Sequence, residues 1–338
     1  MTERLLPTAN EDERAFEEGL RPRRLTEYVG QTRIVENLRV YIKAALMRSE
    51  HLDHALFHGP PGLGKTTLAY IMAEELGVPI RCTTGPALEK TGDLAAILTN
   101  LEERAVLFID EIHRLHPAIE EMLYPALEDF HLDLIIGQGP SARNVRLILK
   151  KFTLIGATTR IGLLTSPLQS RFGIIERLGY YSFKELSSII QRSARILAVE
   201  VTSEGAEEIA IRARGTPRIA NRLLRRVRDF ATVSGTALID RKAAHEALER
   251  LGIDRNGFDE IDMKILETVV RTFSGKPVGL KSIAVAVGEN PDTIEDVYEP
   301  YLIQNGFLSR TPKGRVATEK AFKYFGALPP KTQVGLFD

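Results

Sequence analysis

An eight-residue glycine-rich segment gives the clearest chemical signal in the sequence. Residues 59–66 have the sequence GPPGLGKT, and they lie between the apolar run 55–58 and a helical pattern that ends at Gly77. Glycines at this spacing let backbone N–H groups wrap around phosphates, and the amino end of the following helix adds a partial positive charge. Lys65 would then reach the β- and γ-phosphates of a nucleotide, and the Thr66 hydroxyl would bind magnesium. The segment therefore predicts a phosphate-binding loop (P-loop) rather than an ordinary glycine turn.

Two carboxylates follow the next apolar run. Residues 106–109 are apolar, and Asp110 and Glu111 come directly after them. Asp110 can hold magnesium through water, and Glu111 can polarise an attacking water. Alone, the pair could equally be a solvated acidic cap at a strand end, but its position downstream of the P-loop favours nucleotide hydrolysis. His113 and His116 lie nearby at i,i+3 spacing, which is not the zinc-protease pattern, so we expect ordinary structural histidines.

The elements that must position these groups alternate between strand and helix as far as about residue 181. Apolar runs at 55–58, 106–109 and 152–155 predict buried strands, and 66–76 predicts a helix. This alternation predicts an α/β domain over residues 1–181, with a parallel sheet covered by helices on both faces. The domain opens with an acidic leader, residues 11–18, which we expect to be mobile.

The rest of the chain predicts two smaller domains. Residues 182–252 show only helical periodicity, with one helix beginning at Pro217, and predict an all-helical domain. Gly252 to Gly257 is interpreted as a linker. Residues 256–338 predict three helices (259–273, 281–287 and 293–304) followed by two short strands around the turn 311–314. Three helices and a hairpin are the plan of a winged helix.

The composition narrows the function only slightly. Among 338 residues, 45 basic and 45 acidic side chains balance, so net charge predicts neither a nucleic-acid nor a membrane partner. The single cysteine, Cys82, excludes an internal disulfide and fits a reducing cytosol. The first thirty residues lack the apolar core of a signal peptide, and no apolar stretch approaches the ~20 residues that span a bilayer. We therefore expect a soluble cytoplasmic protein.

Several further stretches resemble a known family. They are LRP at 20–22, YVGQ at 28–31, DEIHRL at 110–115, GATTR at 156–160, SRFG at 170–173, GTPR at 215–218 and RTPKGR at 310–315. The sequence resembles the AAA+ ATPases and, among them, the RuvB family, motors that drive branch migration of Holliday junctions in homologous recombination and DNA repair. The P-loop alone indicates an NTPase and the middle stretches indicate AAA+, whereas DEIHRL and the terminal hairpin are typical of RuvB. The likeness covers about residues 20–335.

The resemblance implies a nucleotide site assembled from several parts of the chain, with ATP and Mg²⁺ as cofactors. The residues implied to contact the nucleotide are Leu20, Arg21, Tyr28, Gly62, Lys65, Thr66, Thr67, Glu128, Asp129, Phe130, Arg171, Tyr181 and Arg218. The implied metal ligands are Thr66 and Asp110. The implied catalytic residues are Lys65, Asp110, Glu111, Thr159, Arg171 and Arg218. Thr159 would be the polar sensor at its strand end, although the sequence does not separate it from Thr158.

Arg171 carries the strongest implication about assembly. It resembles an arginine finger, which acts on the nucleotide of a neighbouring subunit and stabilises transition-state charge, with an effect on the order of 10³–10⁵ in rate. A finger of this kind makes the active unit an oligomer, and the resemblance implies a homohexameric ring. Arg218 would reach the γ-phosphate from the helical domain, which makes that domain a lid. One departure from the family pattern is Gln169, where a basic residue is expected, but no assigned role depends on it.

The hairpin of the winged helix is the candidate DNA contact. Arg310 and Arg315 flank its turn and Lys313 lies at the tip, so all three can meet backbone phosphates without reading base sequence. The preceding helix is expected to be repelled by DNA because it is acidic, with Asp292, Glu295, Asp296 and Glu299. The alternative is that the winged helix binds protein or that its hairpin is only solvated.

An apolar hairpin is also predicted between Leu132 and Leu149. Its residues Ile135, Ile136 and Leu147 suggest a protein interface, and the resemblance implies that it docks the junction-binding partner RuvA, with RuvC reached through the assembled complex. The alternative is two more core strands. Separately, an arginine run along one helix is expected to be solvated or subunit-facing rather than a DNA track; it comprises Arg222, Arg225, Arg226 and Arg228.

Three functions are compatible with parts of this sequence. The first is a helicase-like ATPase that moves duplex DNA through or past a ring, and the resemblance extends it to the SOS response to DNA damage. The second is a clamp-loader or helicase-loader ATPase, which shares the first two domains; the C-terminal winged helix argues against it. The third is a DNA-binding regulator that uses ATP only as a switch, and it would need neither Glu111 nor Arg171.

Overall fold

The computed structural model describes residues 11–136, 143–236 and 238–329. They form two compact units. One spans Glu18–Tyr181, and the other combines the chain from Ser182 onward with the segment before Glu18. No helix within the described ranges is long and apolar enough to cross a membrane.

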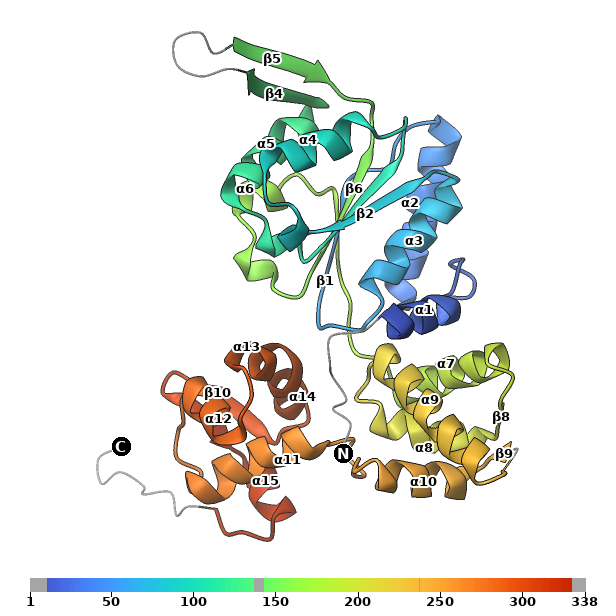
Figure 1. The fold of residues 1–338 in the computed structure, drawn as a ribbon, viewed down its shortest axis with the longest axis vertical. Helices are drawn as coiled ribbons and strands as arrows, with labels where there is room; N and C mark the ends of the chain where they lie inside the picture. Colours follow the sequence, from blue (N-terminus) through green and yellow to red (C-terminus); the bar gives the residue numbers. More distant parts are fainter. Residues whose placement is uncertain (1–10, 137–142, 237, 330–338) are drawn as a thin grey trace. The chain divides into compact units, whose positions relative to one another are not determined.

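A five-stranded parallel sheet forms the centre of the first unit (Figure 1). In the order β2-β3-β6-β1-β7, its strands are β2 (Ile80–Thr84), β3 (Val106–Asp110), β6 (Thr153–Thr158), β1 (Ala55–His58) and β7 (Ile174–Arg177). The three middle strands are those that the apolar runs predicted, because they are buried on both faces. The edge strands β2 and β7 carry exposed residues, so neither has a continuous apolar run, and the sequence did not predict them.

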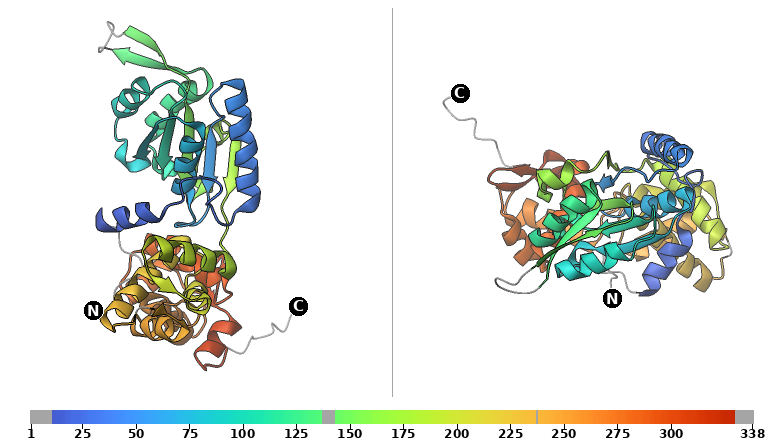
Figure 2. Two further views of the ribbon diagram at one scale, coloured as in Figure 1. Left: turned by 90° about the vertical axis from the view of Figure 1, so that its right-hand side faces the viewer. Right: turned by 90° about the horizontal axis from the view of Figure 1, so that it is seen from above.

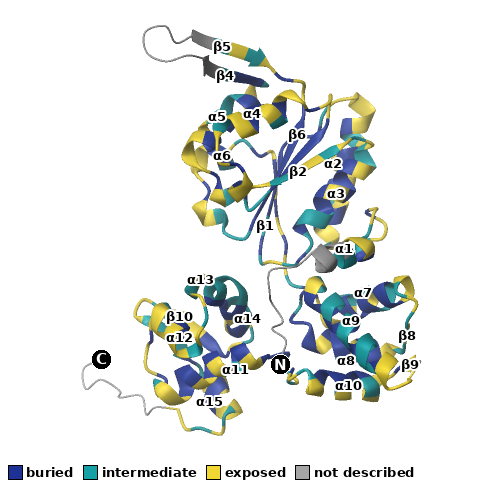
Figure 3. Cartoon of the chain, in the orientation of Figure 1, coloured by how far each residue is buried: buried dark blue, intermediate teal, exposed yellow. Residues whose placement is uncertain are grey.

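Helices cover both faces of the sheet, as predicted (Figures 1 and 2). One face carries α2 (Thr32–Arg48) and α3 (Lys65–Leu76), and the other carries α4 (Thr91–Thr99), α5 (Pro117–Glu128) and α6 (Ser166–Gln169). Leu107, Ile109 and Leu154 form one core with apolar residues of α4 and α5, and Figure 3 shows the buried residues gathered along the strands. The acidic leader (residues 11–18), expected to be mobile, lies within the helix α1 (Glu11–Leu20).

The apolar hairpin is not part of this sheet. β4 (His131–Ile136) and β5 (Arg143–Ile148) form a separate antiparallel pair that projects from the domain (Figure 1). The alternative interpretation as two more core strands is therefore wrong. Leu132 and Leu147 are directly opposite each other in the pair, and both pack against the core that α4 and α5 share.

His54 connects the sheet to the end of α5. Its side chain is buried, its Nδ1 accepts a hydrogen bond from Leu154 N (2.9 Å), and its Nε2 lies 3.0 Å from Leu127 O. Since Nδ1 accepts, Nε2 must carry the hydrogen, and a neutral ring satisfies both partners. Burial lowers the pKa of His54 to about 4, and the hydrogen bond to Leu127 opposes this shift.

We expect His54 to make the folded protein sensitive to acid. Its folded pKa lies below the unfolded value of about 6.5, so the unfolded state binds more protons between these two pH values. The stability that neutral His54 contributes, roughly 3 kcal/mol, is complete above about pH 6.5 and is lost as the pH falls toward 4.

Urea unfolding of wild type and His54→Gln between about pH 7.5 and 4.5 measures this contribution. The variant should be less stable at the upper pH, because one buried hydrogen bond is lost. Its free energy of unfolding should also change less with acid. The same pH dependence in both proteins would show that another group is responsible.

Helices dominate the first part of the second unit. They are α7 (Phe183–Ile196), α8 (Ser203–Arg212), α9 (Pro217–Val233) and α10 (Arg241–Arg250). α7 begins at a capping box, in which Ser182 and Glu185 each accept a hydrogen bond from the other's backbone N–H. The all-helical prediction overlooked a parallel pair of two-residue strands, β8 (Glu200–Val201) and β9 (Leu238–Ile239), which are too short for periodicity to detect.

The last part of the second unit is a winged helix, as predicted. Its elements are α11 (Glu260–Glu267) with a π-helical turn (Thr268–Thr272), α12 (Leu280–Val287), α13 (Pro291–Thr293) with a π-helical turn (Ile294–Tyr298) and α14 (Glu299–Gln304), then β10 (Leu308–Thr311), β11 (Gly314–Ala317) and α15 (Glu319–Tyr324). The short α15 was not predicted; its Phe322 is buried in the core of this domain. Gly314 has a φ of +133°, and a Cβ there would lie 2.5 Å from Val278 O, so the hairpin rests directly on that backbone.

Candidate nucleotide and DNA sites

The strand order brings three loops of the predicted site together. β3, β6 and β1 are neighbours in that order and run parallel, so their carboxyl ends lie side by side. We call this end of the sheet its carboxyl edge, and the end where the strands begin its amino edge. The P-loop follows β1, Asp110 ends β3, and Thr158 ends β6. The phosphate, acidic and sensor residues predicted from the sequence therefore meet at one edge, although they lie far apart along the chain.

The P-loop adopts a backbone conformation that depends on its glycines. Gly59 and Gly64 have φ values of +137° and +102°, and a Cβ on them would lie 2.5 Å from Leu178 O and from the Tyr28 hydroxyl respectively. α3 begins at Lys65, whose buried Nζ donates to two carbonyl oxygens of the loop at 2.7 and 2.8 Å. An ammonium group inside a glycine loop at a helix amino end fits the phosphates of a nucleotide.

Two tyrosines from distant parts of the first unit close one side of the P-loop. The hydroxyl of Tyr181 lies 2.9 Å from that of Tyr28 and 3.1 Å from Leu63 O. Burial, together with the neighbouring tyrosine, raises the pKa of Tyr28. Leu20 is buried, and the Arg21 guanidinium lies 5.4 Å from the centre of a tyrosine ring of α3. Of the residues predicted to contact base and sugar, Tyr28 and Tyr181 are the pair brought directly to the loop.

A tight turn at the end of β3 positions the two carboxylates. Asp110 Oδ1 accepts a hydrogen bond from Glu111 N at 2.9 Å, and Glu111 has a φ of +48°. The half-exposed carboxylate of Glu111 pairs with Arg114 at 2.9 Å. The turn leaves both carboxylates at the carboxyl edge of the sheet, on a strand separated from β1 only by β6.

The two threonines after β6 differ in their surroundings. Thr158 is buried; its hydroxyl lies 3.0 Å from His113 Nδ1 and accepts a hydrogen bond from Arg160 N at 3.0 Å. Thr159 is half-buried beyond the strand end. The hydroxyl of Thr158 is thus engaged within the domain, which favours Thr159 as the sensor. The contact also gives His113 a structural role, in line with the sequence interpretation.

Arg171 lies at the amino edge of the sheet, where the strands begin. It follows α6 and precedes β7, whose first residue binds His54 O at the amino end of β1. Its Nη2 lies 3.1 Å from Glu128 Oε1, and its guanidinium lies 4.4 Å from the centre of the Tyr124 ring. Lys65 belongs to the carboxyl edge, so Arg171 and Lys65 lie at opposite edges of the sheet within one chain.

Glu128, Asp129 and Phe130 share this amino edge. The Phe130 ring packs edge-on against Phe152, immediately before β6, with centroids 5.8 Å apart. Glu128 ends α5 and contacts Arg171. Within one subunit, therefore, these three residues do not join the P-loop with which the sequence grouped them.

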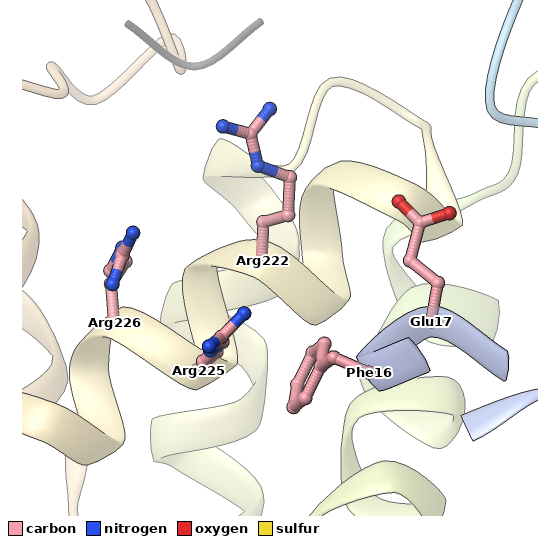
Figure 4. A pocket seen from close by; sticks show the side chains of 5 residues that line it. All are labelled: Phe16, Glu17, Arg222, Arg225 and Arg226. Atoms are coloured by element: carbon pink, nitrogen blue, oxygen red, sulfur yellow. The ribbon is translucent and has the colours of Figure 1, made fainter. Parts of the chain in front are cut away.

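Arg218 lies in the first turn of α9 in the second unit, where its Nε and Nη2 donate to the Glu17 carboxylate at 2.9 and 3.0 Å. No residue pattern in the sequence singles out Glu17 as the partner of Arg218. The arginine run continues along α9, and a pocket shown in Figure 4 is lined by Phe16, Glu17, Arg222, Arg225 and Arg226. Arg225 lies over the Phe16 ring at 4.6 Å. Three arginines of the run therefore line a pocket beside the end of α1, whereas Arg228 pairs with Asp229 at 3.2 Å.

The arginines of the wing hairpin turn toward the acidic helix. Arg310 donates to Glu299 and Glu295, both at 2.8 Å, and Arg315 lies 2.9 Å from Glu299 and 3.5 Å from Glu295. The side chain of Arg310 is 52% exposed, that of Arg315 14%, and Lys313 at the turn is exposed. The hairpin therefore neutralises two of the carboxylates from which repulsion of DNA by the acidic helix was predicted, and that repulsion stays a prediction.

The predicted partner surface is described only in part. The side chains of Ile135 and Ile136 lie outside the described residues. Leu147 is half-buried against the domain core. Ile148 was not among the predicted interface residues. It is 79% exposed, because alternation along β5 places it on the face opposite Leu147.

Known proteins match this arrangement along most of the chain. Residues 20–178 match the P-loop domain of the Holliday junction DNA helicase RuvB, residues 181–254 the RuvB AAA lid domain, and residues 255–326 the RuvB C-terminal winged helix domain. The Thermotoga maritima RuvB Holliday junction branch migration motor is 52% identical, with 92% of this chain and 100% of that chain covered and a TM-score of 0.84. A single-residue variant of that protein gives 51% identity, 92% and 99% coverage and a TM-score of 0.85. The chain therefore belongs to the RuvB family of Holliday junction DNA helicases.

Proposed function

We propose that this chain is the ATP-hydrolysing subunit of a homohexameric ring that moves duplex DNA and so drives branch migration of Holliday junctions. One observation carries the proposal: complementary parts of an ATPase site occupy opposite edges of one sheet. Lys65, Asp110 and Glu111 belong to the carboxyl edge, and Arg171 belongs to the amino edge. A subunit built in this way would complete its site head to tail with a neighbour, and such contacts form a ring when the rotation between subunits closes.

ATP and Mg²⁺ are the proposed cofactors. The residues proposed to hold the phosphates are Gly62, Lys65, Thr66 and Thr67, and those proposed to hold the metal are Thr66 and Asp110. Bound Mg²⁺ neutralises charge on the phosphates during transfer. Glu111 would orient and polarise the attacking water, Thr159 would sense the γ-phosphate, and the base and sugar would lie against Leu20, Arg21, Tyr28 and Tyr181. The buried ammonium of Lys65 at the amino end of α3 supports this assignment.

Arg171 would contact the nucleotide that is bound to the neighbouring subunit. Glu128, Asp129 and Phe130 share its sheet edge, so their proposed nucleotide contact also belongs to that neighbour. Arg218 would reach the γ-phosphate of its own subunit once Glu17 releases it. The proposed moving parts are a large domain (1–181), a lid (182–252) and a winged helix (256–338).

The wing is the proposed contact with duplex DNA, through Arg310, Lys313 and Arg315. Phosphate contacts of this kind give affinity without base recognition, which suits a motor that moves along any junction. The hairpin that projects from the large domain, with Ile135, Ile136 and Leu147, is proposed to dock RuvA; exposure of Ile148 supports an apolar contact there. RuvC would be reached through the assembled complex. The proposed setting is the cytoplasm, in recombination and in the SOS response to DNA damage.

Branch migration of a synthetic four-way junction tests this function. Purified protein with Mg²⁺, ATP and RuvA should separate the junction into its duplex products, and omission of ATP should abolish the separation. ATP turnover with no junction movement under any of these conditions would contradict the motor assignment. An ATPase stimulated by junction DNA but unaffected by RuvA would contradict the proposed docking hairpin.

Two wing variants should change DNA affinity in opposite directions. Arg310→Ala removes one phosphate contact, so duplex binding should weaken at every sequence, and the slope of log K against log salt should fall by about one. Glu295→Gln removes a carboxylate that competes with phosphate for Arg310, so affinity should rise a few-fold. Fluorescence anisotropy with a labelled duplex at several salt concentrations measures both effects.

Lys323→Ala is the matched control for the wing variants. Lys323 is an exposed cation of α15, in the same domain, and pairs with Glu319 at 2.8 Å. It should leave the salt slope unchanged. If Glu295→Gln weakens DNA binding instead, the glutamate is needed to hold the wing in place and does not compete with phosphate.

A further inference from the structure

The linker between the lid and the winged helix is a closed, hydrogen-bonded turn. Asp254 Oδ1 accepts the N–H groups of Asn256 and Phe258 at 2.9 and 2.6 Å, and Asp254 N donates to Phe258 O at 3.0 Å. From the end of the winged helix, Tyr324 donates its hydroxyl hydrogen to Asp254 Oδ2 at 2.7 Å. The sequence predicted only a connecting segment here, and a Gly-flanked segment is often flexible. These bonds instead fix the turn to the winged helix.

The lid holds the same turn from the other side. Arg212, which ends α8, is buried and donates from Nη1 to Ile253 O at 2.7 Å. Gly257 has a φ of +75°, and a Cβ at this position would lie 2.5 Å from Arg212 O. The backbone of the turn therefore touches the end of α8 with no room for a side chain between them.

Arg214 reaches from the lid past the linker into the winged helix. Its Nε donates to Gly257 O at 2.7 Å. Its Nη2 binds the Asp262 carboxylate and lies 3.4 Å from Asp259 Oδ2. Its guanidinium also lies 5.2 Å from the centre of the Tyr301 ring, a cation–π contact. With only 3% of the residue exposed, this one side chain joins the linker, the start of α11 and α14.

The two aspartates are themselves fixed at the start of α11. Asp259 Oδ1 accepts the N–H groups of Ile261 and Asp262 at 3.0 Å, and Asp262 Oδ2 accepts the N–H of Asp259 at 3.0 Å. Each carboxylate therefore both caps the helix and holds Arg214. Separating a buried ion pair of this kind leaves charge without compensation. The contact between the lid and the winged helix therefore resists opening.

The other end of this connection is the predicted γ-phosphate sensor. Arg214 and Gly215 have φ values of +55° and +66° and form the turn between α8 and α9, and Arg218 lies four residues after Arg214. We propose that Arg214 is a positioning residue that locks the lid and the winged helix into one rigid lever. A rotation of the lid by Arg218 then displaces the wing through the same angle. The rotation of the lid by Arg218 rests on the proposed function. The rigid connection between the lid and the winged helix does not depend on it.

Distance measurements between two spin labels test the rigidity directly. Val233 in α9 and Val285 in α12 are 90% and 84% exposed, so both accept a label after replacement by cysteine in a Cys82→Ser background. Labelled subunits are diluted with unlabelled full-length protein. We expect one narrow distance distribution that is the same with ADP and with a non-hydrolysable ATP analogue. A distance that changes with the nucleotide in the otherwise unaltered protein would overturn the proposal.

Arg214→Lys tests whether this residue is the lock. Lysine keeps the charge but cannot bind Gly257 and Asp262 at once as a guanidinium does, so the distribution should broaden. Arg250→Lys is the matched control, because Arg250 is an exposed lid residue at the end of α10. Gly257→Ala is a second variant, which separates the turn from α8 without removing a charge. If both variants match the control, Arg214 and Gly257 do not lock the lever.

The amount of junction movement per ATP hydrolysed distinguishes a lever held by Arg214 from a merely structural role of this residue. For Arg214→Lys and Gly257→Ala we expect ATP turnover within about twofold of wild type, and junction movement per ATP hydrolysed lower by roughly tenfold. A proportional loss of both activities would overturn the lever. Absence of junction movement in wild type would count against the proposed function, while the label distances would still decide the rigidity.

Discussion

Replacing Arg171 by alanine should reduce ATP turnover by the ring on the order of 10³–10⁵-fold while leaving ATP binding intact. In the proposed function the guanidinium would stabilise charge that develops on the transferred phosphoryl group. Arg171 belongs to the sheet edge opposite Lys65. Binding is expected to persist because the P-loop of the same subunit is unchanged. Steady-state phosphate release gives the turnover, and a fluorescent ATP analogue gives the affinity.

A mixing experiment shows on which subunit Arg171 acts. Arg171→Ala subunits keep an intact P-loop, and Lys65→Ala subunits keep an intact Arg171, so each protein alone is expected to be inactive. In an equal mixture, roughly a quarter of the interfaces combine the intact halves of both, and turnover should return at those sites. No recovery from a mixture shown to form shared rings would mean that Arg171 acts within its own subunit or not at all.

Lys151→Ala is the control for lost positive charge at the same edge. Lys151 is exposed and lies just before β6, and no contact joins it to Arg171 among the described residues. Turnover should remain within about twofold of wild type, because an exposed charge at this distance is screened by salt. A loss comparable to that of Arg171→Ala would mean that this edge needs positive charge in general rather than a finger.

The second large effect is expected from Glu111→Gln, which should lower kcat by about 10²–10⁴-fold. The substitution keeps the size and shape of the side chain but removes the basic carboxylate that would polarise the attacking water. Asp110 Oδ1 still accepts the N–H of residue 111, so the turn and the magnesium ligand should be preserved. ATP and Mg²⁺ affinities should therefore change little. Single-turnover hydrolysis after rapid mixing measures the chemical step.

Arg114→Ala is the matched control for Glu111→Gln. Both members of the Arg114–Glu111 pair are about half exposed, 58% and 46%, so the pair contributes little to stability. Removing Arg114 should leave kcat within about twofold. If Glu111→Gln retains full turnover, another group activates the water. The assignment of Glu111 as the residue that polarises the attacking water is then wrong.

Local pattern was sufficient to predict where the segments that are continuous in sequence lie in the fold. The P-loop needs only its glycines, Lys65 and Thr66 between a strand and a helix, and all of these are neighbours along the chain. The same holds for Asp110 and Glu111 after β3 and for the hairpin of the winged helix. The three middle strands were predictable because burial on both faces demands unbroken apolar runs. Edge strands β2 and β7 lack that constraint, and the residue pattern did not mark them.

Pairings between distant residues were not predictable from local pattern. Three ion pairs join charges that are separated in sequence: Arg218 with Glu17, Arg310 with Glu299, and Arg214 with Asp262. Many other carboxylates of the chain could have served as the partners of these arginines. Which ones do so depends on how the helices and the hairpin pack. The wing shows the consequence, because the acidic residues of its preceding helix alone suggested repulsion of DNA, whereas the folded hairpin neutralises two of them.

By itself, the sequence determined the phosphate chemistry, the alternation that makes an α/β domain, and the order of lid and winged helix. Tertiary structure decided which residues share an edge of the sheet. The strand order places Lys65 and Asp110 together and Arg171 on the far side. It also decided that the linker is a rigid turn held by Arg214. The physical reason is that residue type and spacing fix short-range backbone geometry, whereas contacts between distant residues depend on the packing of the whole fold.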